Sequence, residues 1–186
     1  MHWVGSDVIA AKKYLKHNQI YFKYIGNVIN ICEVKWIQDE LRQIGIDANI
    51  AQFANFPDNE IGVQPLPREF SILSYVGKSR ELFYGIEKLI KLAIDFPEIK
   101  IKIAGIANYS KPLPSNIHLL GWVSDMADQY RNCVLYLRLP EHDGLAFSVL
   151  EALYNCRYVG YSHDFEHVER LYDYSVLKES VQRLYD

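Results

Sequence analysis

Strand-length apolar runs alternate with amphipathic stretches along this chain, and that alternation constrains the fold more than any other feature of the sequence. Residues 70–76, 133–139 and 158–161 are short apolar runs, and stretches with a helical spacing of apolar residues separate them. A helix between two strands carries the chain back across a sheet, so that the two strands run parallel. We therefore predict an α/β fold built on a Rossmann-like parallel sheet.

The predicted elements form two regions that a proline-containing stretch connects. Residues 57–69 hold three prolines and show little periodicity, which is typical of a linker. The predicted boundaries are therefore 1–56 for a partial α/β segment and 70–186 for a larger α/β domain. The strands are predicted at 1–4, 27–32, 48–54, 70–76, 99–103, 117–120, 133–139 and 158–161. The helices are predicted at 8–16, 34–44, 81–96, 147–155, in a short stretch that ends near 132, and from 175 onward.

Charge and composition exclude several classes of protein. The net charge is -3 and no basic run is longer than Lys12-Lys13, so the chain lacks the basic surface of a nucleic-acid-binding protein. No apolar run is long enough to cross a bilayer, and no secretory signal is visible. Cys32, Cys133 and Cys156 lack metal-ligand spacing and lie in apolar stretches, so we expect reduced, buried side chains. These features predict a cytoplasmic protein, with peripheral contact to a membrane left open.

The segment after the run 133–139 carries the residues that are best suited to hold a ligand. Gly144 allows backbone N–H groups to approach a ligand closely. The helix predicted at 147–155 presents unpaired N–H donors and the positive end of its dipole toward a phosphate. Glu151 on this helix can accept hydrogen bonds from ribose hydroxyls. The alternative is a solvated acidic loop that caps a structural helix.

The spacing of two acidic residues in this segment resembles a known signature. Asp143 and Glu151 have seven residues between them, the pair Gly144-Leu145 follows the first, and the pair Ala152-Leu153 follows the second. This pattern resembles the acidic–x7–Glu signature of GT-B glycosyltransferases and is most similar to the retaining family 4 (glycosyl transferases group 1). The resemblance implies a nucleotide-sugar donor-binding domain at 70–186.

The resemblance also implies roles for individual residues. Glu151 would bind the nucleotide ribose, and Asp143, where the family more often has glutamate, would contact the donor hexose. Cys156 stands where the family usually has glycine. The neighbouring residues that the resemblance places at the donor site are His142, Gly144, Leu145 and Ala146, and a solvent-facing loop position remains the alternative for His142.

A second loop, after the run 70–76, carries cations that suit a diphosphate. The family usually has an arginine and a lysine here, which neutralise the leaving diphosphate. Gly77 precedes Lys78, which matches the arginine position, whereas Tyr84 stands at the position of the lysine. Arg80 is a candidate substitute from the same loop, and the alternative is that Lys78 and Arg80 are ordinary surface charges. A leaving diphosphate needs positive charge, and side chains supply it in this family, so the resemblance implies no metal and no cofactor beyond the substrate.

Three further residues have open alternatives. Trp122, in a Gly-Trp-Val turn that resembles the G-x-V turn of the family, either stacks on the nucleotide base or packs structurally. Arg138 either contacts a phosphate or forms an ion pair with Asp143. His2 begins a segment that resembles the H-x-x-G-S/T-D stretch late in the N-terminal domain of these enzymes, which makes it a candidate residue of the catalytic cleft.

The sequence thus favours a glycosyltransferase that moves a hexose from a nucleotide sugar to an unknown hydroxyl acceptor with retention. A complete N-terminal domain of this family has further strands before His2, so we expect a truncated acceptor side and association into a homodimer or with a partner chain. Two alternatives stay open: a catalytically reduced nucleotide-sugar-binding module that needs a partner, and a structural α/β domain that self-associates.

Overall fold

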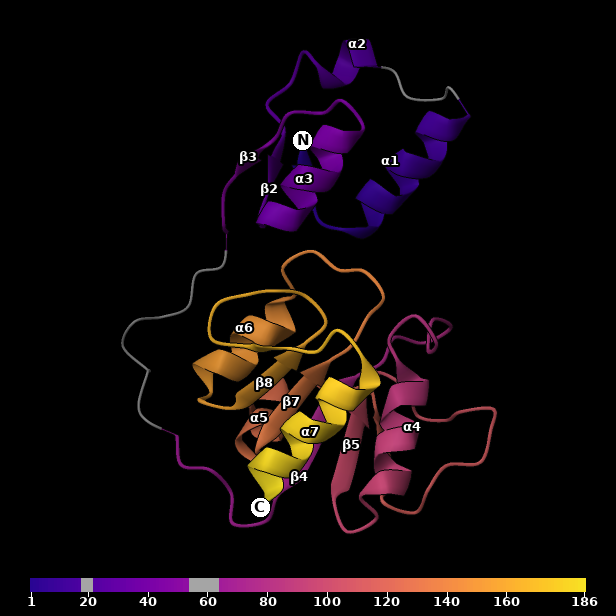
Figure 1. Cartoon of the computed structure of the whole chain (residues 1–186), viewed down its shortest axis with the longest axis vertical. Coiled ribbons are helices and arrows are strands. Elements are labelled where there is room, and N and C mark those ends of the chain that lie inside the picture. Colours follow the sequence, from indigo (N-terminus) through magenta and orange to yellow (C-terminus); the bar gives the residue numbers. More distant parts are fainter. Residues whose placement is uncertain (18–21, 54–63) are drawn as a thin grey trace. The chain divides into compact units, whose positions relative to one another are not determined.

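The computed structural model describes residues 1–17, 22–53 and 64–186, which form two compact units (Figure 1). The first unit comprises Met1–Asn55 and, by its contacts, the segment His142–Phe147; the second comprises Phe56–Glu141 and Ser148–Asp186. Part of the predicted linker 57–69 lies outside the described residues. The predicted domain boundaries remain a prediction, because the short segment His142–Phe147 groups with the N-terminal residues.

The first unit is a small parallel sheet with helices. Its strand order is β1-β2-β3, and both strand pairs are parallel. The helix α3 buries Ile37 and Leu41, which lie four residues apart and therefore on one face. Trp3 is also buried and donates a hydrogen bond from Nε1 to Asn30 Oδ1 at 3.1 Å. The elements are β1 (His2–Trp3), α1 (Ser6–Lys16), α2 (Phe22–Ile25), β2 (Ile31–Cys32), α3 (Lys35–Gln43) and β3 (Asn49–Ile50).

The second unit is a six-stranded sheet in the order β6-β5-β4-β7-β8-β9, and every strand pair is parallel. This arrangement confirms the predicted α/β fold with a parallel sheet. The strands are β4 (Ser71–Tyr75), β5 (Lys100–Ala104), β6 (Ile117–Gly121), β7 (Leu135–Arg138), β8 (Tyr158–Tyr161) and β9 (Glu169–Arg170). The helices are α4 (Ile86–Asp95), α5 (Met126–Arg131), α6 (Phe147–Tyr154) and α7 (Tyr174–Tyr185).

The helices of this unit cover the sheet on both faces. Leu89 of α4 and Leu177 of α7 meet Leu137 of β7 in one buried apolar core, so α4 and α7 pack on the same face (Figure 1). Tyr136 precedes Leu137 on the strand and therefore points to the opposite face, where it contacts Tyr130 of α5. The near-continuous burial of β7 is typical of a parallel strand between two helical layers.

The centre of the sheet is the point where the strand order reverses. From β4 the chain adds β5 and β6 on one side, and it then returns to add β7, β8 and β9 on the other. Ser74 Oγ donates to the Leu137 carbonyl oxygen at 2.8 Å and fixes the two central strands side by side. In open α/β sheets such a reversal leaves a crevice at the carboxyl ends of the two central strands, where ligands bind.

Some sequence predictions were wrong in detail. The helix predicted at 81–96 begins only at Ile86, because residues 81–85 form turns, and Leu82 is exposed. The strand predicted at 27–32 is limited to Ile31–Cys32. Cys156 is exposed, whereas Cys32 and Cys133 are buried as predicted. The short elements α2 and β9 were not predicted. None of the described helices is long and apolar enough to cross a membrane.

Candidate functional site

Two loops meet at the carboxyl ends of the central strands of the second unit. The loop after β4 leads to α4, and the loop after β7 begins at Leu139. Glu141 donates its backbone N–H to the Phe83 carbonyl oxygen at 2.9 Å. Gly85 has a left-handed φ of 77°, and a Cβ built there would lie only 2.7 Å from the Leu139 carbonyl oxygen. The two loops are therefore in direct backbone contact at the reversal point.

Tyr84 is the centre of an aromatic and cationic cluster in these loops. Its ring makes an edge contact with Tyr75 at 5.6 Å between centroids, and it lies so close to Gly77 that a Cβ there would be 2.6 Å from Tyr84 Cε2. The Arg138 guanidinium carbon lies 4.9 Å from the Tyr84 centroid and 5.5 Å from that of Tyr75. Arg138 is only 8% exposed, so a buried positive charge stacks on two tyrosines at the end of β7.

Arg80 approaches the same cluster from the solvent side. Its guanidinium carbon lies 4.1 Å from the Phe83 ring centroid and 5.8 Å from that of Tyr84. Lys78 is exposed on the same loop. The structure thus brings Gly77, Arg80 and Arg138 together around Tyr84, with Lys78 in the adjoining turn. Three cations thus lie near the carboxyl ends of β4 and β7.

Glu151 lies on α6, and a buried tyrosine holds its carboxylate. The Tyr130 hydroxyl donates to Glu151 Oε2 at 3.0 Å. Tyr130 is 1% exposed, whereas Glu151 is half-buried. Burial, followed by the charges of Tyr136 and Glu151, strongly raises the pKa of Tyr130, so its hydroxyl stays protonated and donates across the physiological pH range. No sequence pattern pointed to Tyr130, because it lies 21 positions away from Glu151 in the chain.

The acidic loop His142–Phe147 is held within the first unit. Trp36 Nε1 donates to the Asp143 carbonyl oxygen at 2.9 Å. A Cβ added to Gly144 would lie 2.4 Å from the Val4 carbonyl oxygen, and one added to Gly5 would lie 2.6 Å from Gly144 N. The two glycines therefore allow backbone to lie against backbone, and the H-x-x-G segment directly contacts the acidic loop.

His142 belongs to a charged cluster of the first unit. Its Nε2 lies 2.9 Å from Glu40 Oε2, and Lys12 Nζ lies 3.1 Å from the same oxygen. Burial alone would raise the pKa of Glu40, but its hydrogen bonds with His142 and Lys12 outweigh that effect and lower it. His142 therefore contacts a carboxylate, and the alternative of a merely solvent-facing position is wrong.

The remaining predicted residues are more scattered. Leu145 and Ala146 are buried. His2 on β1 makes an edge contact with Phe53 at 4.9 Å, and its Nε2 lies 3.9 Å from Glu33 Oε2. Trp122 follows β6 at the outer edge of the sheet, two strands away from β4, and it is 87% exposed. Its exposure contradicts the packing alternative and leaves base stacking as a prediction.

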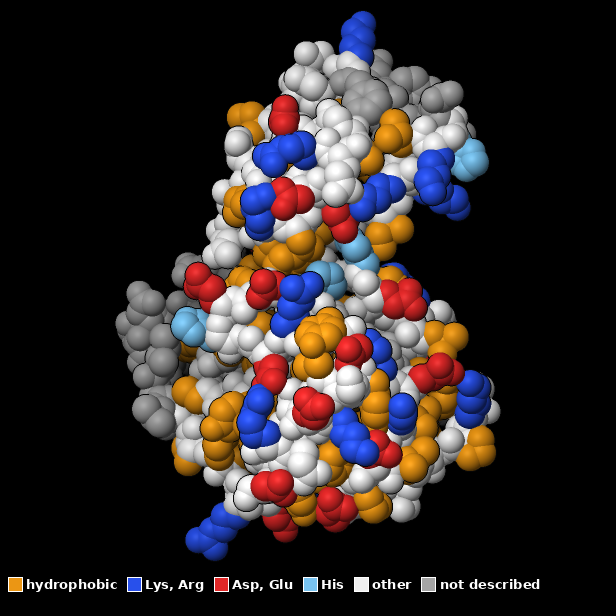
Figure 2. All heavy atoms as spheres, in the orientation of Figure 1, with side chains coloured by type: hydrophobic (Ala, Val, Ile, Leu, Met, Phe, Trp, Pro, Cys, Tyr) orange, Lys and Arg blue, Asp and Glu red, His pale blue; other side chains and the backbone are white. Residues whose placement is uncertain are grey.

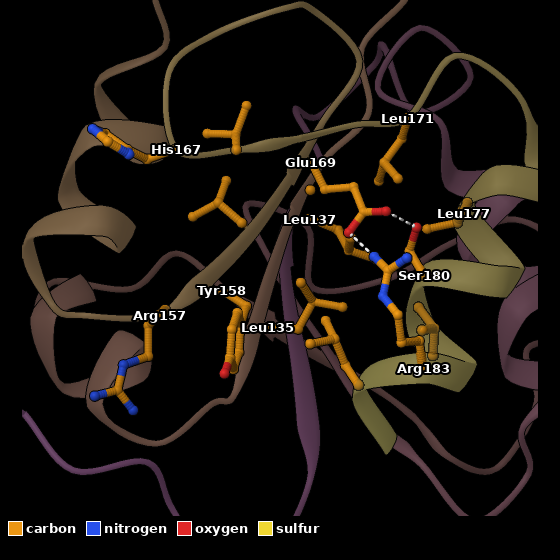
Figure 3. Close-up of a pocket in the computed structure, with 15 residues that line it drawn as sticks. Leu135, Leu137, Arg157, Tyr158, His167, Glu169, Leu171, Leu177, Ser180 and Arg183 are labelled. Carbon is orange, nitrogen blue, oxygen red and sulfur yellow. Dashed lines mark hydrogen bonds and ion pairs between the residues drawn. The ribbon is translucent and has the colours of Figure 1, made fainter. Parts of the chain in front are cut away.

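The second unit also has a groove that lies apart from these residues. About 550 Å³ in volume, it lies between β7, β8, β9 and α7 (Figure 3). Leucines 135, 137, 171 and 177 form its apolar wall. At one end Glu169 accepts hydrogen bonds from Ser180 and Arg183, both at 2.5 Å, and these bonds are drawn as dashed lines in Figure 3. None of the predicted site residues lines this groove. Over the ranges that the structure describes, no group of three His, Cys, Asp or Glu side chains could hold a metal ion.

Comparisons with known proteins identify the fold. No family model matches the chain. A search of curated proteins also found no match. Solved structures do match, and the following three illustrate the likeness. The structure of Anabaena HepE in complex with UDP and glucose gives a TM-score of 0.62 at 13% identity, covering 85% of this chain and 53% of that one. Sucrose-phosphate synthase from Thermosynechococcus elongatus gives a TM-score of 0.62 at 15% identity, and the match covers 83% of this chain and 48% of that one. A mutant of S. aureus TarM in complex with Fondaparinux, alpha-GlcNAc-glycerol and UDP gives a TM-score of 0.60 at 16% identity. This match covers 83% of this chain and 36% of that one.

The likeness extends over most of this chain but over only part of its neighbours. The chain spans from 36% to 53% of the length of the three structures. Identities of 13 to 16% show the fold alone. The parallel sheets with flanking helices agree with that likeness. The chain therefore has the α/β fold of the GT-B glycosyltransferases.

Proposed function

We propose that the chain binds a nucleoside diphosphate hexose and transfers the hexose to a hydroxyl acceptor with retention. The observation that carries this proposal is the cationic cluster at the reversal point, where Arg80 and Arg138 contact Tyr84 and Lys78 adjoins them. This is where a parallel sheet of this topology binds its ligands, and a leaving diphosphate needs positive charge. The neighbours of like fold include proteins crystallised with UDP.

In this proposal each residue has a simple task. Lys78, Arg80 and Arg138 stabilise the diphosphate, Glu151 accepts hydrogen bonds from the ribose, and Asp143 contacts the hexose, as the signature at 143–151 implies. The bond between the anomeric carbon and the phosphate oxygen breaks, and the acceptor oxygen bonds to that carbon on the same face. The released phosphate oxygen takes the acceptor proton. Catalysis would rest on positioning and charge stabilisation.

Nucleotide binding tests the donor site. Isothermal titration of UDP, GDP, ADP and their hexose conjugates should show saturable binding of one base, and Glu151→Ala should weaken it. Lys78→Gln should also weaken binding of the diphosphate. Lys100→Gln is the matched control, because Lys100 is exposed at the amino end of β5, the opposite edge of the sheet. If none of these nucleotides binds to the wild-type protein, or if both lysine variants behave alike, the proposed donor site is wrong.

A second candidate function is binding without transfer. Tyr84 occupies the position where the family resemblance expects lysine, and its ring packs on Gly77 and Arg138. The first unit also exposes apolar side chains, among them Ile29 and Phe53. Both observations favour a nucleotide-sugar-binding module that associates with a second copy or a partner chain. Binding of a sugar nucleotide without turnover on any hydroxyl acceptor, together with a dimer mass by light scattering, would select this candidate.

A further inference from the structure

The hydrogen bond between Tyr130 and Glu151 links two helices on the same face of the central sheet. Tyr130 lies on α5 and Glu151 lies on α6, and the bond from the phenol to Glu151 Oε2 is 3.0 Å long. Removing a hydroxyl of this kind leaves the carboxylate without a charge-assisted hydrogen bond. The bond therefore limits the rotamers that Glu151 can adopt.

Tyr130 itself is held firmly. Asp125 caps α5 by accepting from the Asp128 N–H, and Cys133 donates its N–H to the Tyr130 carbonyl oxygen at 3.2 Å. The ring of Tyr130 makes an edge contact with Tyr136 of β7 at 5.4 Å between centroids. Since the ring is almost wholly buried, its hydroxyl has one fixed direction, toward α6. The strand β7 thus sets the position of a carboxylate that lies beyond it in the sequence.

The arrangement leaves the second carboxylate oxygen of Glu151, Oε1, for another hydrogen-bond donor. Among the described residues, Tyr130 is the one side chain that donates a hydrogen bond to Glu151, and it does so to Oε2. An ionised carboxylate only accepts hydrogen bonds, and its two oxygens offer several acceptor positions. A ribose offers two neighbouring hydroxyl donors, whereas a 2′-deoxyribose offers one. A carboxylate fixed at one oxygen can distinguish these sugars better than a freely rotating one.

We propose that Tyr130 is a positioning residue that orients Glu151 and makes the nucleotide site selective for ribonucleotides over 2′-deoxyribonucleotides. This inference rests on the proposed function, because it takes Glu151 as the ribose ligand. It adds to the proposed function a residue that acts on the ligand through Glu151.

The test compares two tyrosine variants in the full chain. Tyr130→Phe removes the hydroxyl and keeps the ring. Tyr174→Phe is the matched control, because Tyr174 donates the same kind of bond to Asp95 Oδ2 at 3.0 Å on another part of the unit. The probes are whichever of UDP, GDP or ADP binds to the wild-type protein, and its 2′-deoxy counterpart, with affinities measured by isothermal titration.

Tyr130→Phe should lower ribonucleotide affinity about tenfold, as expected for one hydrogen bond to a charged group. The 2′-deoxy affinity should change much less, so the ribo preference falls, while Tyr174→Phe leaves both affinities unchanged. In a Glu151→Gln background, Tyr130→Phe should have no further effect.

The outcomes separate this inference from the proposed function. If Glu151→Gln weakens binding but Tyr130→Phe binds like the wild type, or weakens ribo and deoxy binding equally, the positioning role is overturned and the donor site stands. If the wild-type protein binds none of the nucleotides, the proposed function fails and the inference falls with it.

Discussion

Replacement of Gly85 by alanine should strongly destabilise the second unit, because Gly85 combines a left-handed backbone with a close approach to the loop after β7. Its φ is 77°. An added Cβ would lie 2.7 Å from the Leu139 carbonyl oxygen and 2.9 Å from Leu139 Cβ, whereas ordinary contacts begin at 3.4 Å. An alanine must therefore strain its own backbone and also push the chain at Leu139 away from the loop after β4.

The expected cost has two parts. A non-glycine residue in the left-handed region costs about 1–2 kcal/mol, and overpacking of a tight site adds about 1–3 kcal/mol. Gly85→Ala should therefore lower the free energy of unfolding by about 3 kcal/mol. Gly121→Ala is the matched control in the same unit, because φ is 68° there and the nearest atom to an added Cβ is Ala107 Cβ at 3.3 Å. Gly121→Ala should therefore incur the backbone cost but little of the overpacking cost.

Thermal unfolding followed by far-UV circular dichroism measures the difference. At about 3 °C per kcal/mol for a unit of this size, Gly85→Ala should lower the Tm by about 10 °C and Gly121→Ala by about 5 °C. Since two units can unfold in separate transitions, the transition to compare is the one that both variants shift. Equal shifts for the two variants would refute the close contact between the loops after β4 and β7.

Three further outcomes are expected. Cys156 has a left-handed φ of 57°, so Cys156→Gly should stabilise the protein by about 1 kcal/mol, measured by urea unfolding; a loss of stability would contradict this. Asp173 caps α7 through the Val176 N–H, and this bond lowers its pKa. Because its pKa in the folded protein lies below the unfolded value near 4, the ionised Asp173 carboxylate stabilises the fold above that value. This stabilisation is lost as the pH falls through the folded pKa, so Asp173→Ala should destabilise the protein at pH 7 and not at pH 2. Burial raises the pKa of Cys133 to about 12 and also raises that of Cys32, so iodoacetamide at pH 8 should modify Cys156 first, as peptide mass spectrometry would show; early labelling of Cys133 would contradict its burial.

The sequence predicted the larger strands and helices well because their apolar patterns coincide with their burial. The strand predicted at 99–103 corresponds to β5, which buries its isoleucines while Lys100 is exposed. The start of α4 was placed too early, because the apolar spacing continues back to Leu82 while Gly85 turns left-handed and interrupts the helix. The strand β9 has a charged sequence, Glu169–Arg170, and is held by pairing with β8, which no local pattern reveals.

The candidate site was predictable only where residues follow one another closely in the chain. The spacing of Asp143 and Glu151 and the cations of the loop after β4 could be read directly. The contact of Tyr84 with Arg138 could not, because it depends on β4 and β7 being neighbours in the sheet. For the same reason the hydrogen bond from Tyr130 to Glu151 was missed. Charged side chains of both signs are spread over the surface in view and mark no site by themselves (Figure 2).

The position of β4 between β5 and β7 has a consequence for biosynthesis. The hydrogen bond from Ser74 to Leu137 joins residues that are 63 positions apart. At about 5–20 residues per second, a ribosome needs roughly 3–13 s to add that stretch of chain. During this interval one edge of an apolar strand has no native partner, and unpaired strand edges promote aggregation. Slow translation between β4 and β7 should therefore increase the need of the nascent chain for chaperones.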